Sequence, residues 1–276
     1  MFTFNCAGRL LVVDKPLVMG IINTTPDSFY EASRRQTIDD IVAKAEQMVS
    51  EGATILDIGG QSTRPGSVAV GEEEELKRVI PAIEAIRKRW PDIFISIDTY
   101  YSRVALESVN AGASIINDVS AGTIDPSMIA MAATLHVPYV LMHMQGSPQT
   151  MQQAPHYENV TREVLDFLII KTNELKKEGI KDIIIDPGFG FGKTIAHNFE
   201  LMRNLELFRI IPYPLLIGIS RKSTVCKTLG ITSAEALNGT TVLNTVSLLR
   251  GASILRVHDV KEAIEAIKLV AAVNTA

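Results

Sequence analysis

Polar residues follow several short apolar runs in this chain, and their types suit the binding of a small molecule. Asp98 and Asp186 end the runs IFISID and DIIID, and Asn117 lies in the run SIIND. Carboxylate and amide groups among apolar strands can bind a flat heterocycle, because one carboxylate accepts two hydrogen bonds from an amidine-like edge. Taken one at a time, these residues are equally well explained as helix caps or turn formers.

A second set of residues at the ends of apolar runs is cationic. Arg221 and Lys222 follow the run LLIGIS, and Arg256 and His258 lie at the end of SILRVH. In a chain with a formal net charge of -4, cations placed directly after apolar strands favour an anion site over scattered surface charge. The two sets together predict a site for a heterocycle that has an anionic group.

Two polar segments follow the first and second apolar runs. They read NTTPDSF and DIGGQSTRPGS. The glycine pair of the second segment allows a sharp turn, Thr63 and Arg64 supply hydrogen-bond donors, and Pro65 stiffens the tip. We expect both segments to act as substrate loops or lids.

The stretch DPGFGFGKT, residues 186–194, resembles a nucleotide-binding loop but does not match one. The phosphate-binding motif G-x-x-x-x-G-K-[ST] requires glycine at Pro187, and the dinucleotide motif G-x-G-x-x-G requires glycine at Lys193. We instead expect Asp186 to end a strand and face the site. Lys193 and Thr194 are expected in an outward-facing loop or at a helix start.

Eight short apolar runs alternate with segments of helical periodicity. The runs are residues 17–22, 54–59, 93–98, 114–118, 138–143, 182–187, 215–220 and 253–257. Apolar strands that are each followed by a helix indicate a parallel sheet covered on both faces, and eight such units predict an α/β fold of the (β/α)8 TIM barrel type. An open doubly wound sheet is the alternative. We expect one domain over residues 1–276, with a short N-terminal hairpin in FTFNCAGRLLVV.

In a barrel, the loops at the carboxyl ends of the strands build the binding site. The residues at the predicted strand ends should therefore converge on one mouth. They are Asn23, Asp57, Asp98, Asn117, His143, Asp186, Arg221, Lys222, Ser223, Arg256 and His258.

Composition limits the class of protein. The chain is 46% apolar and 21% charged, as in ordinary globular proteins, and its net charge argues against nucleic acid or a membrane surface as partner. Asp14 to Pro16 interrupt the apolar run 10–22, so no membrane span is expected. Cys6 and Cys226 cannot form a disulfide framework, no secretory signal opens the sequence, and neither HExxH nor CxxC suggests zinc. We expect a cytoplasmic protein.

The chain resembles the bacterial dihydropteroate synthases over nearly its whole length. The matching segments, in order, are GIINTTPDSF, DIGGQSTRPGS, SIDT, IIND, LMHMQGSPQTM, DPGFGFGKT, SRKS and RVHDV. The resemblance implies condensation of 6-hydroxymethyl-7,8-dihydropterin diphosphate with 4-aminobenzoate, giving 7,8-dihydropteroate and diphosphate in folate biosynthesis by an SN1-like loss of diphosphate. It also implies competition by sulfonamides at the 4-aminobenzoate position, and a homodimer. The apolar helix GTTVLNTVSLL is a candidate for its interface, but a place in the buried core explains that helix equally well.

The same resemblance assigns roles to particular residues. Those for the pterin are Asp98, Asn117, Met142, Asp186, Phe191, Lys222 and Arg256. Those for 4-aminobenzoate are Thr63, Pro65 and Ser223. Those for the diphosphate are Asn23, Arg256 and His258, with Mg²⁺ at Asn23. Those expected to be catalytic are Lys222, Arg256, Asp98, Arg64 and Glu31.

The first loop departs from the family pattern. The family usually continues PDSFSDGG, whereas this chain reads PDSFYEASRR, so Glu31 replaces an aspartate and the glycine pair is missing. We expect a stiffer, more basic loop in which Glu31 keeps the role of the acid with altered loop closure.

Three other functions remain open. A pterin-binding methyltransferase would share the barrel and the pterin ligands, but it would have no use for STRPG, SRKS and RVHDV. A catalytically silent pterin-binding module should have lost part of the anion site. A generic barrel isomerase is the residual possibility.

Overall fold

The computed structural model describes residues 1–24, 31–61, 70–147 and 150–275, without the side chains of residues 31–37. Eight parallel strands form one sheet in the order β8-β7-β6-β5-β4-β3-β10-β9. They are β3 (Leu17–Asn23), β4 (Ile55–Gly59), β5 (Phe94–Asp98), β6 (Ile115–Asp118), β7 (Tyr139–Met142), β8 (Ile183–Asp186), β9 (Leu216–Ile217) and β10 (Ile254–Val257).

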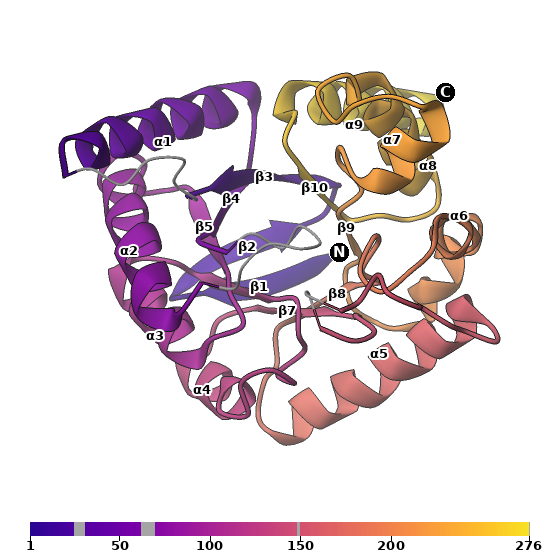
Figure 1. The fold of residues 1–276 in the computed structure, drawn as a ribbon, viewed down its shortest axis with the longest axis horizontal. Coiled ribbons are helices and arrows are strands. Elements are labelled where there is room, and N and C mark those ends of the chain that lie inside the picture. The colour runs from indigo at the N-terminus through magenta and orange to yellow at the C-terminus, as the bar shows by residue number, and fades with distance from the viewer. Residues whose placement is uncertain (25–30, 62–69, 148–149, 276) are drawn as a thin grey trace.

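The sheet closes into a barrel between β8 and β9. A parallel bridge joins Ile185 to Leu215, and the Ile185 N–H donates to the Pro214 carbonyl at 3.0 Å. The predicted (β/α)8 barrel is therefore confirmed, and the open sheet is wrong (Figure 1).

Helices surround the strands on the outside of the barrel, as Figure 1 shows. They are α1 (Glu31–Glu51), α2 (Glu72–Arg89), α3 (Ser102–Ala111), α4 (Met128–Leu135), α5 (Val160–Lys177), α6 (Ile195–Arg203), α7 (Ser223–Leu229), α8 (Leu237–Leu249) and α9 (Val260–Thr275), with the short 3₁₀ helix η1 (Leu205–Ile210). Within the described ranges, none of these helices combines the length and the apolar character that crossing a membrane requires.

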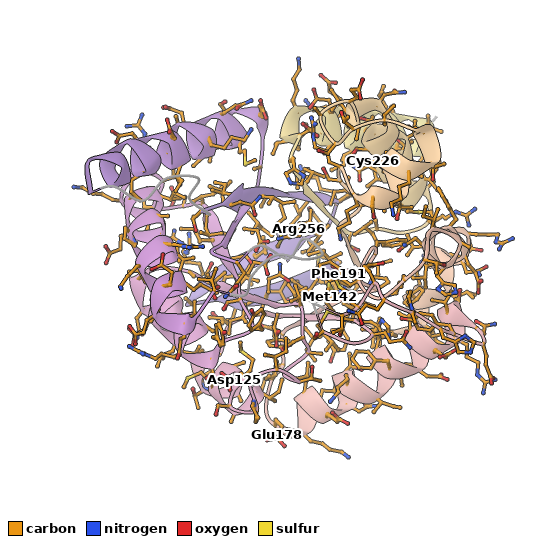
Figure 2. The ribbon with its side chains drawn as sticks, in the orientation of Figure 1. Asp125, Met142, Glu178, Phe191, Cys226 and Arg256 are labelled. Atoms are coloured by element: carbon orange, nitrogen blue, oxygen red, sulfur yellow. The ribbon has the colours of Figure 1, made fainter. Side chains whose placement is uncertain are left out.

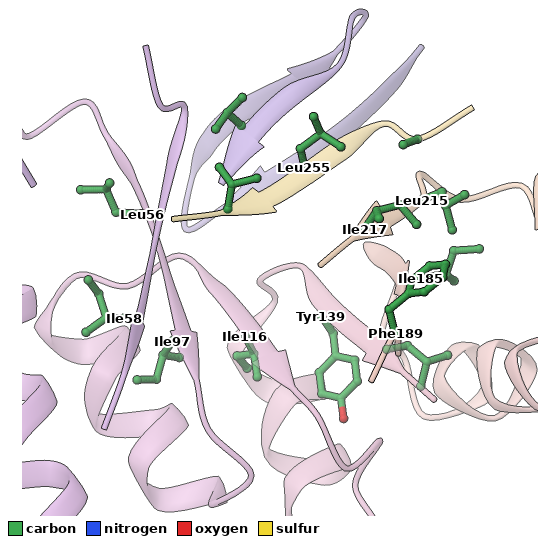
Figure 3. Packing of buried hydrophobic residues seen from close by; sticks show 14 of the residues in the cluster. Leu56, Ile58, Ile97, Ile116, Tyr139, Ile185, Phe189, Leu215, Ile217 and Leu255 are labelled. Atoms are coloured by element: carbon green, nitrogen blue, oxygen red, sulfur yellow. The ribbon is translucent and has the colours of Figure 1, made fainter. Parts of the chain in front are cut away.

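The outer core fills the space between the strands and the helices. Strand residues such as Leu56, Ile97 and Tyr139 are fully buried there (Figure 3). Continuous apolar strands are needed because a parallel sheet of this type is covered on both faces.

The predicted N-terminal hairpin is present, because β1 (Phe2–Cys6) and β2 (Arg9–Val13) pair in antiparallel fashion. It closes the amino-terminal end of the barrel. Its turn residues Ala7 and Gly8 both have positive φ, at 53° and 83°, as a two-residue turn between twisted strands requires. Alternate hairpin side chains are buried against the inward-facing residues of the barrel strands. These side chains are Phe4, Cys6, Leu11 and Val13.

Candidate active site

Several barrel strands have a polar or site residue at the mouth two positions after a buried apolar residue. Side chains along a strand alternate between its faces, so residues two apart both face the barrel interior. In five strands, a residue of the apolar cluster beneath the mouth is followed two positions later by a residue of the predicted or observed site. The pairs are Ile55 and Asp57, Ile115 and Asn117, Val140 and Met142, Ile184 and Asp186, and Ile254 and Arg256.

Arg256 lies among the acidic residues of the mouth. Its Nε donates to Asp57 Oδ2 at 2.6 Å, and its Nη2 donates to Asp98 Oδ2 at 2.5 Å. Asn117 Nδ2 also donates to Asp57 Oδ2, at 3.1 Å. Burial opposes the charge of the guanidinium, but Asp57 and Asp98 more than offset it and raise the pKa of Arg256. The guanidinium is therefore held in place by residues of β4 and β5, which lie beyond β3 in the sheet.

Asp57 was expected at the mouth, but, unlike Asp98 and Arg256, it was given no binding role on sequence grounds. Its side chain is buried, and Oδ1 has no hydrogen-bond partner among the described residues. A buried polar atom without a partner is costly and is often explained by a missing ligand or water. The signal that could have identified Asp57 was its position two residues after an inward-facing isoleucine.

The mouth contains titratable groups whose pKa values are shifted towards neutral pH. Burial raises the pKa of Asp98 to about 7, although Arg256 opposes that effect. Burial also raises the pKa of Asp186, against the charge of Lys222, and lowers the pKa of Lys222 itself to about 8. Perturbed groups gathered in this way are typical of functional sites.

Lys222 and two apolar side chains form the opposite wall. Lys222 Nζ donates to the Phe189 carbonyl at 2.6 Å and lies 4.6 Å from the centre of the Phe191 ring. Phe191 and Met142 belong to an apolar cluster with Tyr100, Val119 and Met151. Figure 2 shows Met142, Phe191 and Arg256 near the middle of the ring of strands, whereas Asp125 and Glu178 lie at the outer edge of the molecule.

His258 lies next to the same end of β10. Its Nδ1 is 3.0 Å from Ser220 Oγ, and its backbone N–H donates to that oxygen at 3.2 Å. Burial, with the charge of Arg256, lowers the pKa of His258 to about 4. The imidazole is therefore neutral near pH 7.

Two other predicted residues lie at exposed positions. Asn23 ends β3, and Ser223 begins α7 directly after Lys222. Thr63, Arg64 and Pro65 lie outside the described residues, as does the side chain of Glu31, so their roles stay predictions.

The expectation that Lys193 faces outward is wrong. Its side chain is buried, with 2% exposure, and its ammonium group reaches the end of β7. Thr194 does start a helix, since its hydroxyl accepts from the His197 N–H at 3.1 Å as the N-cap of α6. The direction of the lysine depends in part on two acceptors of His143, which directly follows β7 and lies far away in sequence.

Arg221 differs from the cations grouped with it on sequence grounds. Its guanidinium makes two hydrogen bonds of 2.8 Å to Asp259 and donates to the carbonyls of Ser233 and Ala234. These bonds tie the end of β9 to the segments before α8 and α9. Arg221 thus stabilises the contact between these three segments, whereas Lys222 lies at the mouth.

Comparison with known proteins first defines the class. Residues 19–258 match the family described as "Pterin binding enzyme".

Named relatives narrow that class. The chain is 44% identical over 271 residues to dihydropteroate synthase of Escherichia coli K12, covering 98% of this chain and 95% of the relative. Dihydropteroate synthase of Xanthomonas albilineans, solved with 4-aminobenzoic acid, is 41% identical with a TM-score of 0.92, over 99% of this chain and 98% of that one. The Yersinia pestis enzyme, solved with a sulfonamide drug complex, has a TM-score of 0.93 at 40% identity and covers 100% of both chains. The chain belongs to the pterin-binding enzymes and, among them, to the dihydropteroate synthase family of transferases.

Proposed function

We propose that this chain condenses 6-hydroxymethyl-7,8-dihydropterin diphosphate with 4-aminobenzoate and releases 7,8-dihydropteroate and diphosphate. The observation that supports it most directly is the arrangement of Arg256 between Asp57 and Asp98, facing Lys222, at one barrel mouth. A structure of the Xanthomonas albilineans relative in complex with 7,8-dihydropteroate has a TM-score of 0.89 to this chain at 38% identity.

The pterin is assigned to the slot between the acidic strands and the Phe191 wall. Asp98, Asn117 and Asp186 bind the polar edge of the ring, and the unpartnered Oδ1 of Asp57 is a further acceptor there. Lys222 donates to the ring, and Arg256 lies against its face, which suits a planar delocalised cation. Met142 and Phe191 line the apolar part of the slot.

The diphosphate is assigned to Asn23, Arg256 and His258. Because the pKa of His258 is lowered to about 4, this side chain binds phosphate oxygen through a hydrogen bond from a neutral ring. Arg256 supplies the positive charge. Thr63, Pro65 and Ser223 are assigned to 4-aminobenzoate, and Glu31 and Arg64 to the loops that cover the site.

The chemistry needs electrostatic stabilisation more than a base. The aryl amine is already neutral at pH 7, and the electron-rich pterin permits the diphosphate to leave before the amine attacks. The protein must stabilise the departing anion and keep water from the resulting cation. Arg256 and Lys222 serve the first need, and the apolar wall with Phe191 and Met142 serves the second.

Mg²⁺ fits this site as an ion that arrives with the diphosphate. Asn23 offers one neutral oxygen, and no group of three or more His, Cys, Asp or Glu side chains in the described residues could hold a metal. Protein sites for Mg²⁺ commonly use one or two side chains together with substrate phosphates. When bound, the ion would neutralise charge on the leaving group.

The decisive experiment measures diphosphate release and dihydropteroate formation by the purified chain. Both should require both substrates, and both should fall when Mg²⁺ is chelated. A chain that binds pterin but forms no dihydropteroate under varied Mg²⁺ would instead be a methyltransferase or a silent pterin-binding module.

Two lysines, one directly before α7 and one within it, test the assigned roles. Lys222→Ala should lower kcat/KM for the pterin substrate by about 10² to 10³, the usual loss for one well-placed electrostatic donor. Lys227→Ala, at an exposed position of α7, should leave it within about twofold. Near-normal turnover in the Lys222 variant would contradict the assignment.

The chain is further proposed to act as one domain and as a homodimer in the cytoplasm. One sheet contains strands from residues 17 to 257, which supports a single domain. Large apolar residues are exposed on α7, α8 and α9, which share one corner of the molecule, and exposed apolar patches often mark interfaces. They are Leu229, Val242, Leu249, Leu269 and Val273. Both cysteines are free, as in a reducing compartment.

The oligomeric state can be measured by sedimentation. The wild-type chain should sediment as a dimer, and Val242→Glu should shift it to the monomer. A monomeric wild-type chain at micromolar concentration would contradict the proposed interface.

A further inference from the structure

The loop between β8 and α6, residues 187–193, is held by side chains that donate to its backbone. Each carbonyl from residue 188 to residue 192 accepts such a hydrogen bond. The donors are Lys193 to Gly188 and Phe191, both at 3.0 Å, Lys222 to Phe189 at 2.6 Å, Gln152 to Gly190 at 2.6 Å, and Tyr157 to Gly192 at 2.8 Å. The path of this loop is therefore fixed by donors from several parts of the chain.

The loop is also pressed against the segment that follows β7. Gly188 and Gly192 have φ values of +71° and +61°, in the region that favours glycine. A Cβ at Gly188 would lie 1.9 Å from the His143 carbonyl oxygen, and one at Gly192 would lie 2.4 Å from the Gln145 carbonyl oxygen. The two backbones thus approach more closely than any other residue type would allow.

Lys193 joins these two segments. Besides the Gly188 and Phe191 carbonyls, its Nζ lies 2.9 Å from His143 Nδ1 and 3.3 Å from the His143 carbonyl oxygen. All four acceptors are uncharged when the imidazole is neutral, and burial, helped by Lys193, lowers the pKa of His143 to about 2. While Lys193 is charged, Nδ1 must accept from it, and the ring then carries its proton on Nε2.

Burying an ammonium group among neutral acceptors is expensive, so its retention needs a reason. Burial lowers the pKa of Lys193 to about 7, which reflects that cost, although the charge of Asp186 opposes the shift. A loop that merely connected β8 to α6 could be held by uncharged groups alone.

The loop positions three groups of the pterin slot. The Gly188 N–H donates to Asp186 Oδ1 at 2.7 Å, the Phe189 carbonyl accepts from Lys222, and the Phe191 ring lies beside the Lys222 ammonium group. Lys193 bonds the carbonyls of Gly188 and Phe191, which flank Phe189 on both sides.

We propose that Lys193 is a positioning residue for the pterin slot. It clamps the 187–193 loop to the end of β7 and thereby sets Asp186, Phe191 and Lys222 relative to the ring. It acts through these groups and does not touch the reacting atoms. The proposal rests on the proposed pterin roles of those three residues.

The test replaces Lys193 by methionine, which keeps an unbranched side chain and removes the ammonium group. Lys193→Met should raise KM for the pterin diphosphate about tenfold or more while KM for 4-aminobenzoate stays within about threefold. Tyr157→Phe, which removes one donor to the same loop, should raise the pterin KM only about two- to threefold. Lys177→Met, at an exposed position of α5, should change neither constant.

Hydrogen exchange supplies a second readout. In Lys193→Met, amides of residues 187–193 and 143–146 should exchange faster, while those of β4 and β5 should keep their wild-type protection. An unchanged pterin KM with lowered thermal stability would show a merely structural role and overturn the proposal. Equal rises in both KM values would overturn it as well.

A third measurement separates this proposal from the proposed function. Calorimetric binding of the pterin diphosphate without 4-aminobenzoate requires no turnover, and its Kd should rise about tenfold in Lys193→Met. A wild-type chain that binds this compound but forms no dihydropteroate would contradict the proposed function only. If Lys193→Met fails to fold, Lys193→Gln gives the same comparison with a polar side chain, and an unchanged Kd in it would refute the clamp.

Discussion

The two ends of the barrel use the same strands for opposite purposes. At the amino-terminal end, inward-facing residues such as Ile55 and Ile184 pack against the hairpin. Two residues further along, Asp57 and Asp186 face the mouth. The lower end buries apolar surface and stabilises the fold, whereas the mouth buries charge that weakens it. The difference shows that, on one strand, a residue that stabilises the fold and a residue that can bind a ligand lie only two positions apart.

Titratable groups at the two ends show the same contrast. Burial raises the pKa of the Cys6 thiol, in the apolar cluster of the lower end, to about 12, so this thiol stays protonated and unreactive. Burial raises the pKa of Asp98 as well, but Arg256 opposes the shift and leaves it at about 7. At the mouth, burial and nearby opposite charges together leave Asp98 and Lys222 with pKa values near neutral pH.

Removing the cation of the mouth should have the largest effect. Arg256→Ala leaves Asp57 and Asp98 facing one another without a shared partner and removes the positive charge proposed for the diphosphate. We expect kcat/KM to fall by about 10² to 10³ in steady-state assays. Arg89→Ala, which removes an exposed ion pair with Glu46, is the control and should stay within about twofold. Wild-type turnover in the Arg256 variant would contradict the proposal that the charged groups of the mouth are needed for catalysis.

The pH dependence of kcat/KM for the pterin substrate should come from the mouth. Below about pH 7, Asp98 takes up a proton and loses its role as an acceptor, so kcat/KM should fall about tenfold per pH unit. Above about pH 8, Lys222 loses its proton, and the value should fall again. Asp98→Asn should lower the plateau and flatten the acidic limb. An acidic limb that persists in this variant would assign it to another group.

A change at the lower end should affect stability without affecting chemistry. Val13→Ala removes two buried methyl groups beneath the hairpin and should lower the free energy of unfolding by about 2 kcal/mol. Its neighbour Val12 faces outward with 37% exposure, and Val12→Ala should change the free energy by less than about 0.5 kcal/mol. Urea titrations measure both, and kcat should stay within about twofold of wild type. A large loss of kcat in Val13→Ala would contradict this prediction, because it would show that packing at the lower end affects catalysis at the mouth.

Glu75 tests whether charge burial behind the mouth weakens the fold. It is fully buried on α2, accepts from Gln61 Nε2 at 2.7 Å, and has a pKa raised by burial from 4.5 to about 7. Between those two pH values the folded state holds more protons than the unfolded state, so stability falls as pH rises. Glu75→Gln should lack this fall, so from pH 5 to pH 8 its free energy of unfolding should rise by about 2.5 kcal/mol relative to that of the wild type, as urea titrations at both pH values would show. If the free energy of unfolding changed with pH in the same way in both proteins, Glu75 would not be the group that weakens the fold.

Strand periodicity made much of the fold predictable. Apolar runs such as residues 17–22 and 54–59 lie within one residue of the observed strands β3 and β4. Polar residues at their ends, such as Asp98 and Asn117, meet at one mouth because parallel strands all end on the same side of a barrel. These are local properties, since the alternation of side chains along a strand depends on neighbouring residues.

What the sequence determined by itself was the barrel, the short N-terminal hairpin and the set of polar residues at the strand ends. Only the tertiary structure decided which partner each charge has. Arg221 pairs with Asp259, Arg256 pairs with Asp57 and Asp98, and Lys193 turns inward to β7. The physical reason is that a long cationic side chain can reach many places, and its direction is set by acceptors that distant segments bring close only after the barrel has closed.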